Sequence, residues 1–207
     1  MADQRALLFI DGSNFYHALK SIGLSTNLNY PEFGRKLVLG RHLVGIRYYV
    51  GEVRNNLSRS RQQRQFLERI RKQGVHVILG RVERKLLDPD QNPFVTRLRA
   101  IVNDQCDGFD AATRDALMAL CEQPFPQFVE KRVDVAIAVD MIEMAHGDKY
   151  DIAYLLSADG DFVPAVEAVK RAGKKVLAAG PKRGDELKSS VDAFIVLKRE
   201  WFDGLSV

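Results

Sequence analysis

Short apolar runs alternate with longer amphipathic segments along most of the chain. The apolar runs are typical of buried strands and lie at residues 7–10, 44–50, 75–79, 152–156 and 176–179, with a sixth candidate at 194–197. The segments between them predict helices at about 14–22, 31–39, 58–73, 133–145 and 162–172. This alternation predicts an α/β fold, a three-layer sandwich in which helices cover both faces of a mostly parallel sheet of five to six strands.

The stretch from 83 to 130 breaks this regularity. A strong turn signal, Asp88-Pro89-Asp90-Gln91-Asn92-Pro93, separates Leu86-Leu87 from Phe94-Val95, which is compatible with a β-hairpin. The apolar positions from Phe94 onward also fit a helix, and a further helix is predicted from Ala111 to Cys121. We interpret residues 1–207 as a single domain with an insertion at about 83–130.

Composition places the chain among ordinary folded proteins. It has 207 residues, 46% of them hydrophobic and 28% charged, which is enough for one sizeable core. The net charge of +4 favours anionic partners only weakly. Whether the chain acts as a monomer or a homodimer stays open.

The sequence also indicates in which cellular compartment the protein is found. The first residues lack a secretory signal, and no apolar run approaches the roughly 20 residues that a membrane helix needs. Cys106 and Cys121 form no CxxC pair and predict two buried, reduced thiols. We therefore expect a cytoplasmic protein with no membrane contact.

Two of the predicted strands end in acidic turns, and this is where chemistry is expected. Asp11 follows the first strand, and Asp159 follows the strand at 152–156. Ligands of open α/β sheets gather beyond the carboxyl ends of the strands. If these strands are neighbours, the two carboxylates share a small volume and require a cation between them, and Mg²⁺ or Mn²⁺ suits such oxygen ligands.

Helix capping is the structural alternative for each aspartate. Asp11 and Asp161 both precede predicted helices, where carboxylate oxygens accept free backbone N–H groups. Asp134 could be there only to complement a helix dipole. Asp140 is expected on a solvated face or at the core edge, and the polar turn with Asp148 and Asp151 at the surface.

Three motifs together resemble the NYN domain, a family similar to PIN nucleases. They are Asp11-Gly12-Ser13-Asn14, Lys131-Arg132-Val133-Asp134-Val135-Ala136-Ile137-Ala138-Val139-Asp140-Met141 and Ser157-Ala158-Asp159-Gly160-Asp161-Phe162. The resemblance covers residues 5–82 and 131–197, and Ala158 departs from the glycine that related sequences often carry.

The resemblance implies a PIN-like fold and a metal-dependent endoribonuclease. In that hypothesis Asp11, Asp134 and Asp159 are catalytic residues that bind Mg²⁺ or Mn²⁺. Asp161 is a further ligand or supports one, and Asn14 positions a ligand, a water or a phosphate. Water attack would leave a 5′-phosphate and a 3′-hydroxyl.

To bind an RNA substrate, single-stranded or structured, the protein needs positive charge around the predicted cluster of aspartates. We assign substrate binding to Ser13, Ser157 and basic residues that follow the strands, above all Arg54 and Arg84. Further basic residues, Arg59, Arg61 and Arg64, lie in the polar helix predicted at 58–73, which follows the second strand. Tyr16 could stack a base, although packing at the core or rim is the simpler expectation, and His17 is expected to be structural.

Other kinds of site also place an aspartate or a glycine-rich turn after the first strand. A HAD-type phosphatase would need a second aspartate where Ser13 stands, and a Toprim-type site would need a glutamate on the first strand. Dinucleotide binding is disfavoured because GxGxxG does not follow that strand. The remaining alternative is a weakly active or inactive module on the same fold that binds RNA or protein.

Overall fold

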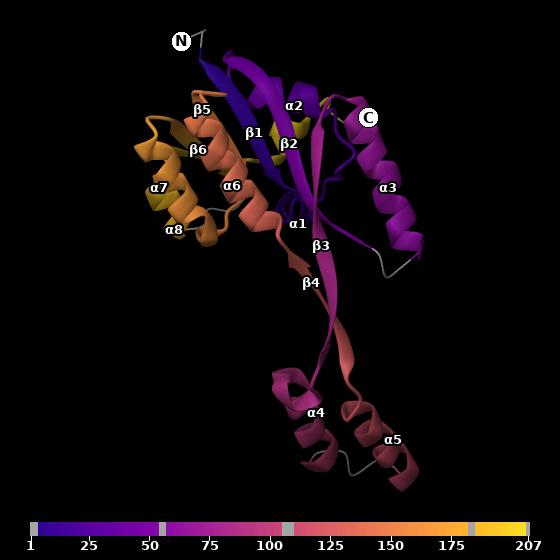
Figure 1. Ribbon diagram of the computed structural model, residues 1–207. Coiled ribbons are helices and arrows are strands. Elements are labelled where there is room, and N and C mark those ends of the chain that lie inside the picture. Colours follow the sequence, from indigo (N-terminus) through magenta and orange to yellow (C-terminus); the bar gives the residue numbers. More distant parts are fainter. Residues whose placement is uncertain (1–3, 54–56, 105–109, 182–184, 206–207) are drawn as a thin grey trace. The chain divides into compact units, whose positions relative to one another are not determined.

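A seven-stranded sheet forms the centre of the protein, as seen in a computed structural model that describes residues 4–53, 57–104, 110–181 and 185–205 (Figure 1). The strand order is β4-β3-β2-β1-β5-β6-β7. The strands are β1 (Arg5–Asp11), β2 (His42–Glu52), β3 (His76–Leu87), β4 (Phe125–Lys131), β5 (Ile152–Leu156), β6 (Lys175–Gly180) and β7 (Ala193–Val196). The predicted α/β class with a mostly parallel sheet is confirmed, with seven strands rather than five to six.

The middle of the sheet explains the apolar runs in the sequence. β1 lies between β2 and β5 and is parallel to both. Every residue of β1 from Ala6 to Asp11 is buried, so both faces of this strand are covered. A strand covered on both faces appears as a continuous apolar run rather than an alternating one. The pairs β2–β3, β5–β6 and β6–β7 are also parallel.

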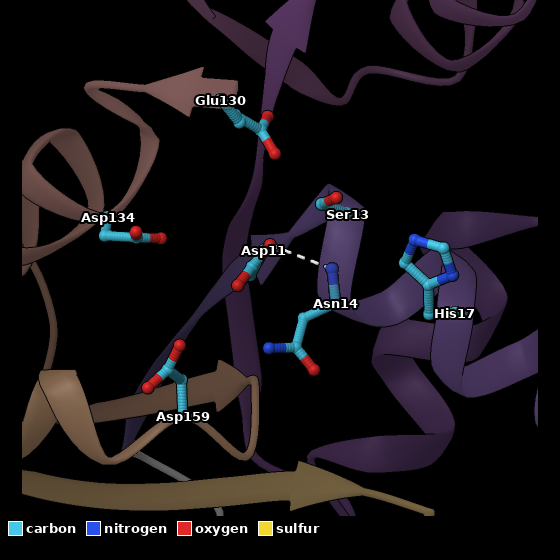
Figure 2. A pocket seen from close by; sticks show the side chains of 7 residues that line it. All are labelled: Asp11, Ser13, Asn14, His17, Glu130, Asp134 and Asp159. Carbon is cyan, nitrogen blue, oxygen red and sulfur yellow. Dashed lines mark hydrogen bonds between the residues drawn. The ribbon is translucent and has the colours of Figure 1, made fainter. Parts of the chain in front are cut away.

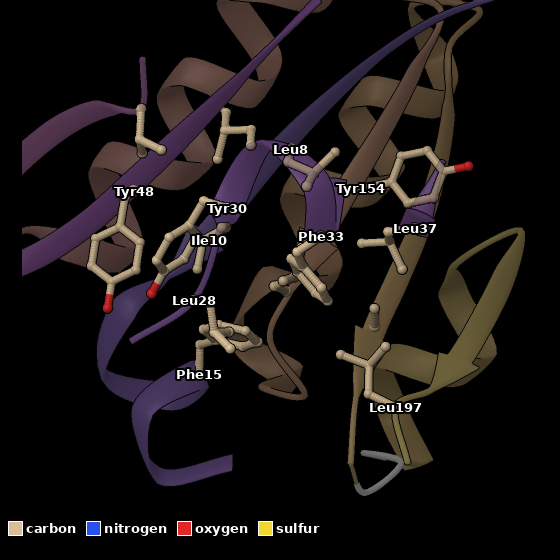
Figure 3. Packing of buried hydrophobic residues seen from close by; sticks show 14 of the residues in the cluster. Leu8, Ile10, Phe15, Leu28, Tyr30, Phe33, Leu37, Tyr48, Tyr154 and Leu197 are labelled. Carbon is tan, nitrogen blue, oxygen red and sulfur yellow. The ribbon is translucent and has the colours of Figure 1, made fainter. Parts of the chain in front are cut away.

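Two apolar clusters cover the two faces of the sheet. The first gathers side chains of α1 (Gly12–Ser21), α2 (Tyr30–Leu37) and α3 (Leu57–Lys72), and Figure 3 shows part of it, including Phe15 and Phe33. The second gathers side chains of α6 (Val133–His146), α7 (Val163–Arg171) and α8 (Asp185–Ser190). The predicted three-layer sandwich is confirmed. Among the residues described, no helix combines the length and apolar character needed to cross a membrane.

The chain divides into two compact units, residues 1–81 with 130–207, and residues 82–129. We call the first the sheet unit and the other the second unit. The second unit contains α4 (Pro93–Asp104) and α5 (Ala111–Cys121). The short helix η1 (Pro89–Gln91) occupies the turn signal, so the hairpin alternative is wrong and the helical one is confirmed. Cys121 is buried as expected, whereas Cys106 lies outside the described residues.

β4 is not predicted by the sequence pattern. Its residues, Phe-Pro-Gln-Phe-Val-Glu-Lys, include Pro126, and proline removes a donor from a strand ladder. Pro124 and Pro126 are instead typical of the end of the preceding helix, α5. β4 occupies one end of the strand order, and an edge strand is the position in a sheet that tolerates proline.

Gly12 allows α1 to begin immediately after β1. A Cβ atom at this position would lie 2.5 Å from Cε1 of Tyr48 and 2.6 Å from the backbone oxygen of Tyr49. Such contacts are far inside van der Waals distance, so only glycine fits against β2 here. The close approach fixes the start of α1, and with it Asp11 and Asn14, at the carboxyl edge of the sheet.

Candidate active site

Asp11 lies at the carboxyl end of β1 and is held by two neighbours. β1 and β5 pair in the register Ile10–Leu156, which brings Asp11 and Ser157 together. The Ser157 hydroxyl donates to Oδ2 of Asp11 at 3.4 Å, and the backbone N–H of Asn14 donates to Oδ1 at 3.0 Å. Asp11 is only 4% exposed. The same carboxylate therefore caps α1 and forms part of the site, so capping and chemistry are not exclusive.

The turn after β5 is built from successive side-chain hydrogen bonds. The Ser157 hydroxyl accepts from the N–H of Asp159 at 3.2 Å, and Oδ1 of Asp159 accepts from the N–H of Asp161 at 3.0 Å. Asp159 caps the short helix η2 (Gly160–Phe162), whereas α7 has no side-chain cap. The expectation that Asp161 caps the helix is therefore wrong, and its side chain is exposed. Ala158 is accommodated without a left-handed backbone.

Asp134 projects from the first turn of α6. That helix begins after Arg132, which has a left-handed φ of 73° and gives no side-chain cap. Two turns further on, Asp140 accepts from the Tyr49 hydroxyl at 2.7 Å and from Nη2 of Arg47 at 2.6 Å. These bonds fasten α6 to β2, and Asp140 fulfils the expected core-edge role.

These elements surround a pocket of about 320 Å³. It is lined by Asp11, Ser13, Asn14, His17, Glu130, Asp134 and Asp159. Figure 2 shows the carboxylates of Asp11, Glu130, Asp134 and Asp159 arranged around one common space. The three aspartates singled out in the sequence thus line one pocket.

Glu130 is the pocket residue that the sequence analysis missed. It lies on β4, and its carboxylate accepts a hydrogen bond from the backbone N–H of Gly51 on β2. The only available signal was its place four residues before Asp134, next to Lys131-Arg132. Residue 130 falls at the end of the predicted insertion, outside the motifs that define the candidate site.

The acidic side chains perturb one another. Burial raises the pKa of Asp11 from 3.8 to about 6, and the charges of Asp134 and Glu130 add to this rise. The Asn14 N–H and the Ser157 hydroxyl oppose it. Burial also raises the pKa of Asp134, together with the charges of Asp159 and Asp161. Asp161 is therefore close enough to act on the pocket electrostatically.

The side chains that line the pocket have the right chemistry for a hard divalent cation, but their oxygens do not converge on a single position. The pocket offers carboxylate, hydroxyl and amide oxygens, the ligands that Mg²⁺ and Mn²⁺ prefer. A cation would also relieve the burial and like-charge repulsion that raise the pKa of Asp11. Within the described residues, no three acidic, histidine or cysteine side chains stand ready to hold one ion.

The remaining predicted residues fall in different places. Ser13 and His17 line the pocket, and His17 is exposed rather than structural. Tyr16 is 40% exposed and absent from the first apolar cluster, so it does not pack in the core. Arg84 is exposed on the part of β3 that belongs to the second unit. Arg54 lies outside the described residues.

Two comparisons with known proteins bear on the fold and ancestry. The chain is 34% identical over 74 residues to the uncharacterized protein MJ0482 of Methanocaldococcus jannaschii, a match that covers 35% of this chain and 31% of that protein. It is also similar to a crystal structure of a protein of unknown function, VPA0982 of Vibrio parahaemolyticus, with a TM-score of 0.58 and 22% identity. That match covers 95% of this chain and 94% of the other, and it supports the fold alone.

A family model gives the more informative match. The model of the NYN domain matches residues 83–198, more than half of the chain. The matched region contains Glu130, Asp134, Asp159 and Asp161. The chain belongs to the NYN domain family, a PIN-like nuclease family.

Proposed function

We propose that the protein is a cytoplasmic, metal-dependent endoribonuclease that hydrolyses RNA phosphodiester bonds. The observation that carries the proposal is the gathering of four carboxylates around one pocket, at the carboxyl edge of a parallel sheet in an NYN domain. Asp11 is the buried carboxylate of the four, its pKa is raised, and a bound cation would stabilise its charged form. Placing like charges side by side opposes folding, so such a cluster of carboxylates is best explained by chemistry.

Each pocket residue has a role in this proposal. Asp11, Asp134 and Asp159 would hold Mg²⁺ or Mn²⁺, with Glu130 and Asp161 as further acidic partners. A bound ion of this kind supplies an acidified water and neutralises charge on the phosphate. Ser157 positions both Asp11 and the Asp159 turn through its hydrogen bonds, which is a more specific role than the substrate contact we expected. Ser13 and Asn14 line the pocket where they can orient a water or a phosphate oxygen.

The reaction is hydrolysis with water as the nucleophile. The water oxygen forms a bond to phosphorus while the bond from phosphorus to the 3′ oxygen breaks. The departing oxygen takes up a proton, which leaves a 3′-hydroxyl on one fragment and a 5′-phosphate on the other. No side chain of the pocket needs to form a covalent intermediate.

Positive charge for the RNA backbone is concentrated on α3. In this helix Arg61, Arg64, Arg71 and Lys72 are exposed, with Glu68 among them, whereas Leu67 and Ile70 are buried. The Gln63 side chain accepts from the N–H of Val53 and donates to the carbonyl of Gly51. Gly51 also binds Glu130 of the pocket, so the first half of α3 adjoins the acidic edge.

We expect the double substitution Arg61→Gln with Arg64→Gln to weaken RNA binding and reduce its salt dependence. Each phosphate contact of a single strand contributes about 0.7 to the slope of log Kobs against log salt. Two lost contacts should therefore lower the slope by about 1.4. Fluorescence anisotropy between 50 and 300 mM salt, in EDTA to prevent cleavage, measures this.

The matched control removes two positive charges at the opposite edge of the sheet. Lys149 and Lys175 are exposed; Lys149 precedes β5 and Lys175 is the first residue of β6, so both lie at the amino ends of these strands. Lys149→Gln with Lys175→Gln should leave the slope unchanged. Equal slopes for the two double variants would show that α3 has no special part in binding RNA.

The proposal itself is tested with end-labelled RNA of about 30 nucleotides and the full-length protein. Cleavage should require Mg²⁺ or Mn²⁺ and stop in EDTA. The products should carry 5′-phosphates, which a phosphate-dependent 5′ exonuclease would then degrade. Binding without cleavage under any metal would instead favour the RNA-binding module. Neither binding nor cleavage would favour the protein-interaction module.

A further inference from the structure

An exposed aromatic pair lies on α1 beside the pocket. The Tyr16 and His17 rings are 5.3 Å apart between centroids and meet edge to face at 79°. The ammonium group of Lys20 lies 5.2 Å from the centre of the Tyr16 ring. Tyr16, His17 and Lys20 are all exposed, so the two rings and the cation are open to a ligand.

The pair is not needed to hold α1 in place. Phe15 and Leu19 point from the other side of the helix into the first apolar cluster, where they are 2% and 1% exposed. Phe15 alone contacts the rings of Tyr30, Phe33 and Phe202. Tyr16, at 40% exposure, is absent from that cluster. Its side chain is therefore free to take a role other than packing.

The pair continues the wall of the pocket. Ser13, Asn14 and His17 of α1 all line the pocket, and Figure 2 shows His17 on the same helix as Asn14. Tyr16 touches His17 on the solvent side of α1. A nucleotide whose phosphate entered the pocket would therefore have its sugar and base within reach of these rings.

We propose that the Tyr16 ring, which meets His17 edge to face, forms a stacking platform for an unpaired nucleobase next to the scissile phosphate. This rests on the proposed function and deepens it, because it assigns single-stranded RNA as the substrate class at this position. Aromatic side chains bind the faces of splayed bases, and those faces are covered in a duplex. Lys20 adds a positive charge beside the stacked base, where the next phosphate of the strand would lie.

The experiment compares Tyr16→Leu with Tyr16→Phe in the full chain. Leucine keeps an apolar side chain and a good helix former but removes the ring, whereas phenylalanine keeps the ring. Affinity for a single-stranded RNA containing 2-aminopurine is measured by fluorescence in EDTA. Tyr16→Leu should bind about 5- to 100-fold more weakly, and Tyr16→Phe should bind like the wild type. Quenching of 2-aminopurine should be lost only with Tyr16→Leu.

A duplex control and thermal melting separate the possible outcomes. A blunt RNA duplex should bind the wild type and Tyr16→Leu equally, because no base face is available to the ring. If Tyr16→Leu binds the single strand as well as the wild type does, the platform is wrong, whether or not the protein cleaves. If Tyr16→Leu loses binding and the wild type never cleaves, the platform stands and the nuclease proposal fails. Equal thermal melting of the variants excludes misfolding as the cause.

Discussion

Replacing Asp11, Asp134 or Asp159 by asparagine should each abolish most RNA cleavage. Asparagine keeps the shape of the side chain but removes a negative charge and a good ligand oxygen. Loss of a group that merely supports a ligand already costs about 10- to 100-fold, so loss of a ligand should cost on the order of a hundredfold or more. Single-turnover rates in Mn²⁺ or Mg²⁺ measure the effect.

The three aspartates should behave as one unit. Because all three line one pocket, a second substitution removes little that the first has left. The double variant Asp11→Asn with Asp159→Asn should therefore be about as slow as either single variant. Multiplicative losses would indicate independent contributions instead of one shared site.

Asp148→Asn is the control for this series. Asp148 is a surface aspartate, and its carboxylate pairs with Arg5 at 2.8 Å and also with Lys174. It precedes β5 and so lies at the amino edge, away from the pocket. Cleavage by this variant should be unchanged. If the pocket aspartates only cap helices, Asn replaces Asp in that role almost equally well, and an active Asp159→Asn enzyme would overturn the metal-site argument.

Asp11→Asn should also raise the free energy of unfolding of the metal-free protein at neutral pH. Burial raises the pKa of Asp11 from 3.8 to about 6 in the folded state. Well below pH 3.8 the carboxyl is protonated in both states and the substitution changes little. Between pH 3.8 and about 6 the unfolded chain releases a proton that the folded protein retains, and above pH 6 the folded protein holds a buried charge that the unfolded chain exposes to water. Wild-type stability therefore falls relative to the variant, by up to about 3 kcal/mol.

Urea denaturation in EDTA at pH 4.0 and pH 8.0 measures this difference. Asp148→Asn again provides the comparison, with the opposite sign, because Lys174 and Arg5 lower the pKa of the Asp148 carboxyl. That substitution should lower stability at pH 8 and matter less at acid pH. A stability gain for Asp11→Asn that is equal at both pH values would mean that charge burial is not its cause.

The apolar runs were sufficient to predict most of the sheet unit. The run at 152–156 matches β5 residue for residue, because a strand buried on both faces has no polar positions to obscure its ends. Asp11 and Asp159 could be brought together only on the condition that their strands are neighbours, because parallel neighbouring strands end at one edge, and the pairing of β1 with β5 meets that condition.

The parts that could not be predicted depend on distant contacts. Glu130 reaches the pocket only because β4 joins the sheet, and Pro126 concealed that strand. The exposure of Tyr16 depends on which neighbours cover α1, and its helical position alone does not reveal them. The capping of η2 by Asp159 rather than by Asp161 depends on a short helix that precedes α7.

Because Asp11 both caps α1 and lines the pocket, the residue at this position should distinguish active relatives from inactive ones. The hydrogen bond from Asn14 to Oδ1 needs only an acceptor oxygen, which asparagine also provides. Selection for the fold alone would let Asp and Asn interchange here, and the expected gain in stability would even favour Asn. A lineage that keeps aspartate at this position accepts a less stable domain, and a drift to asparagine would mark the descendants in which the ancestral chemistry has been abandoned.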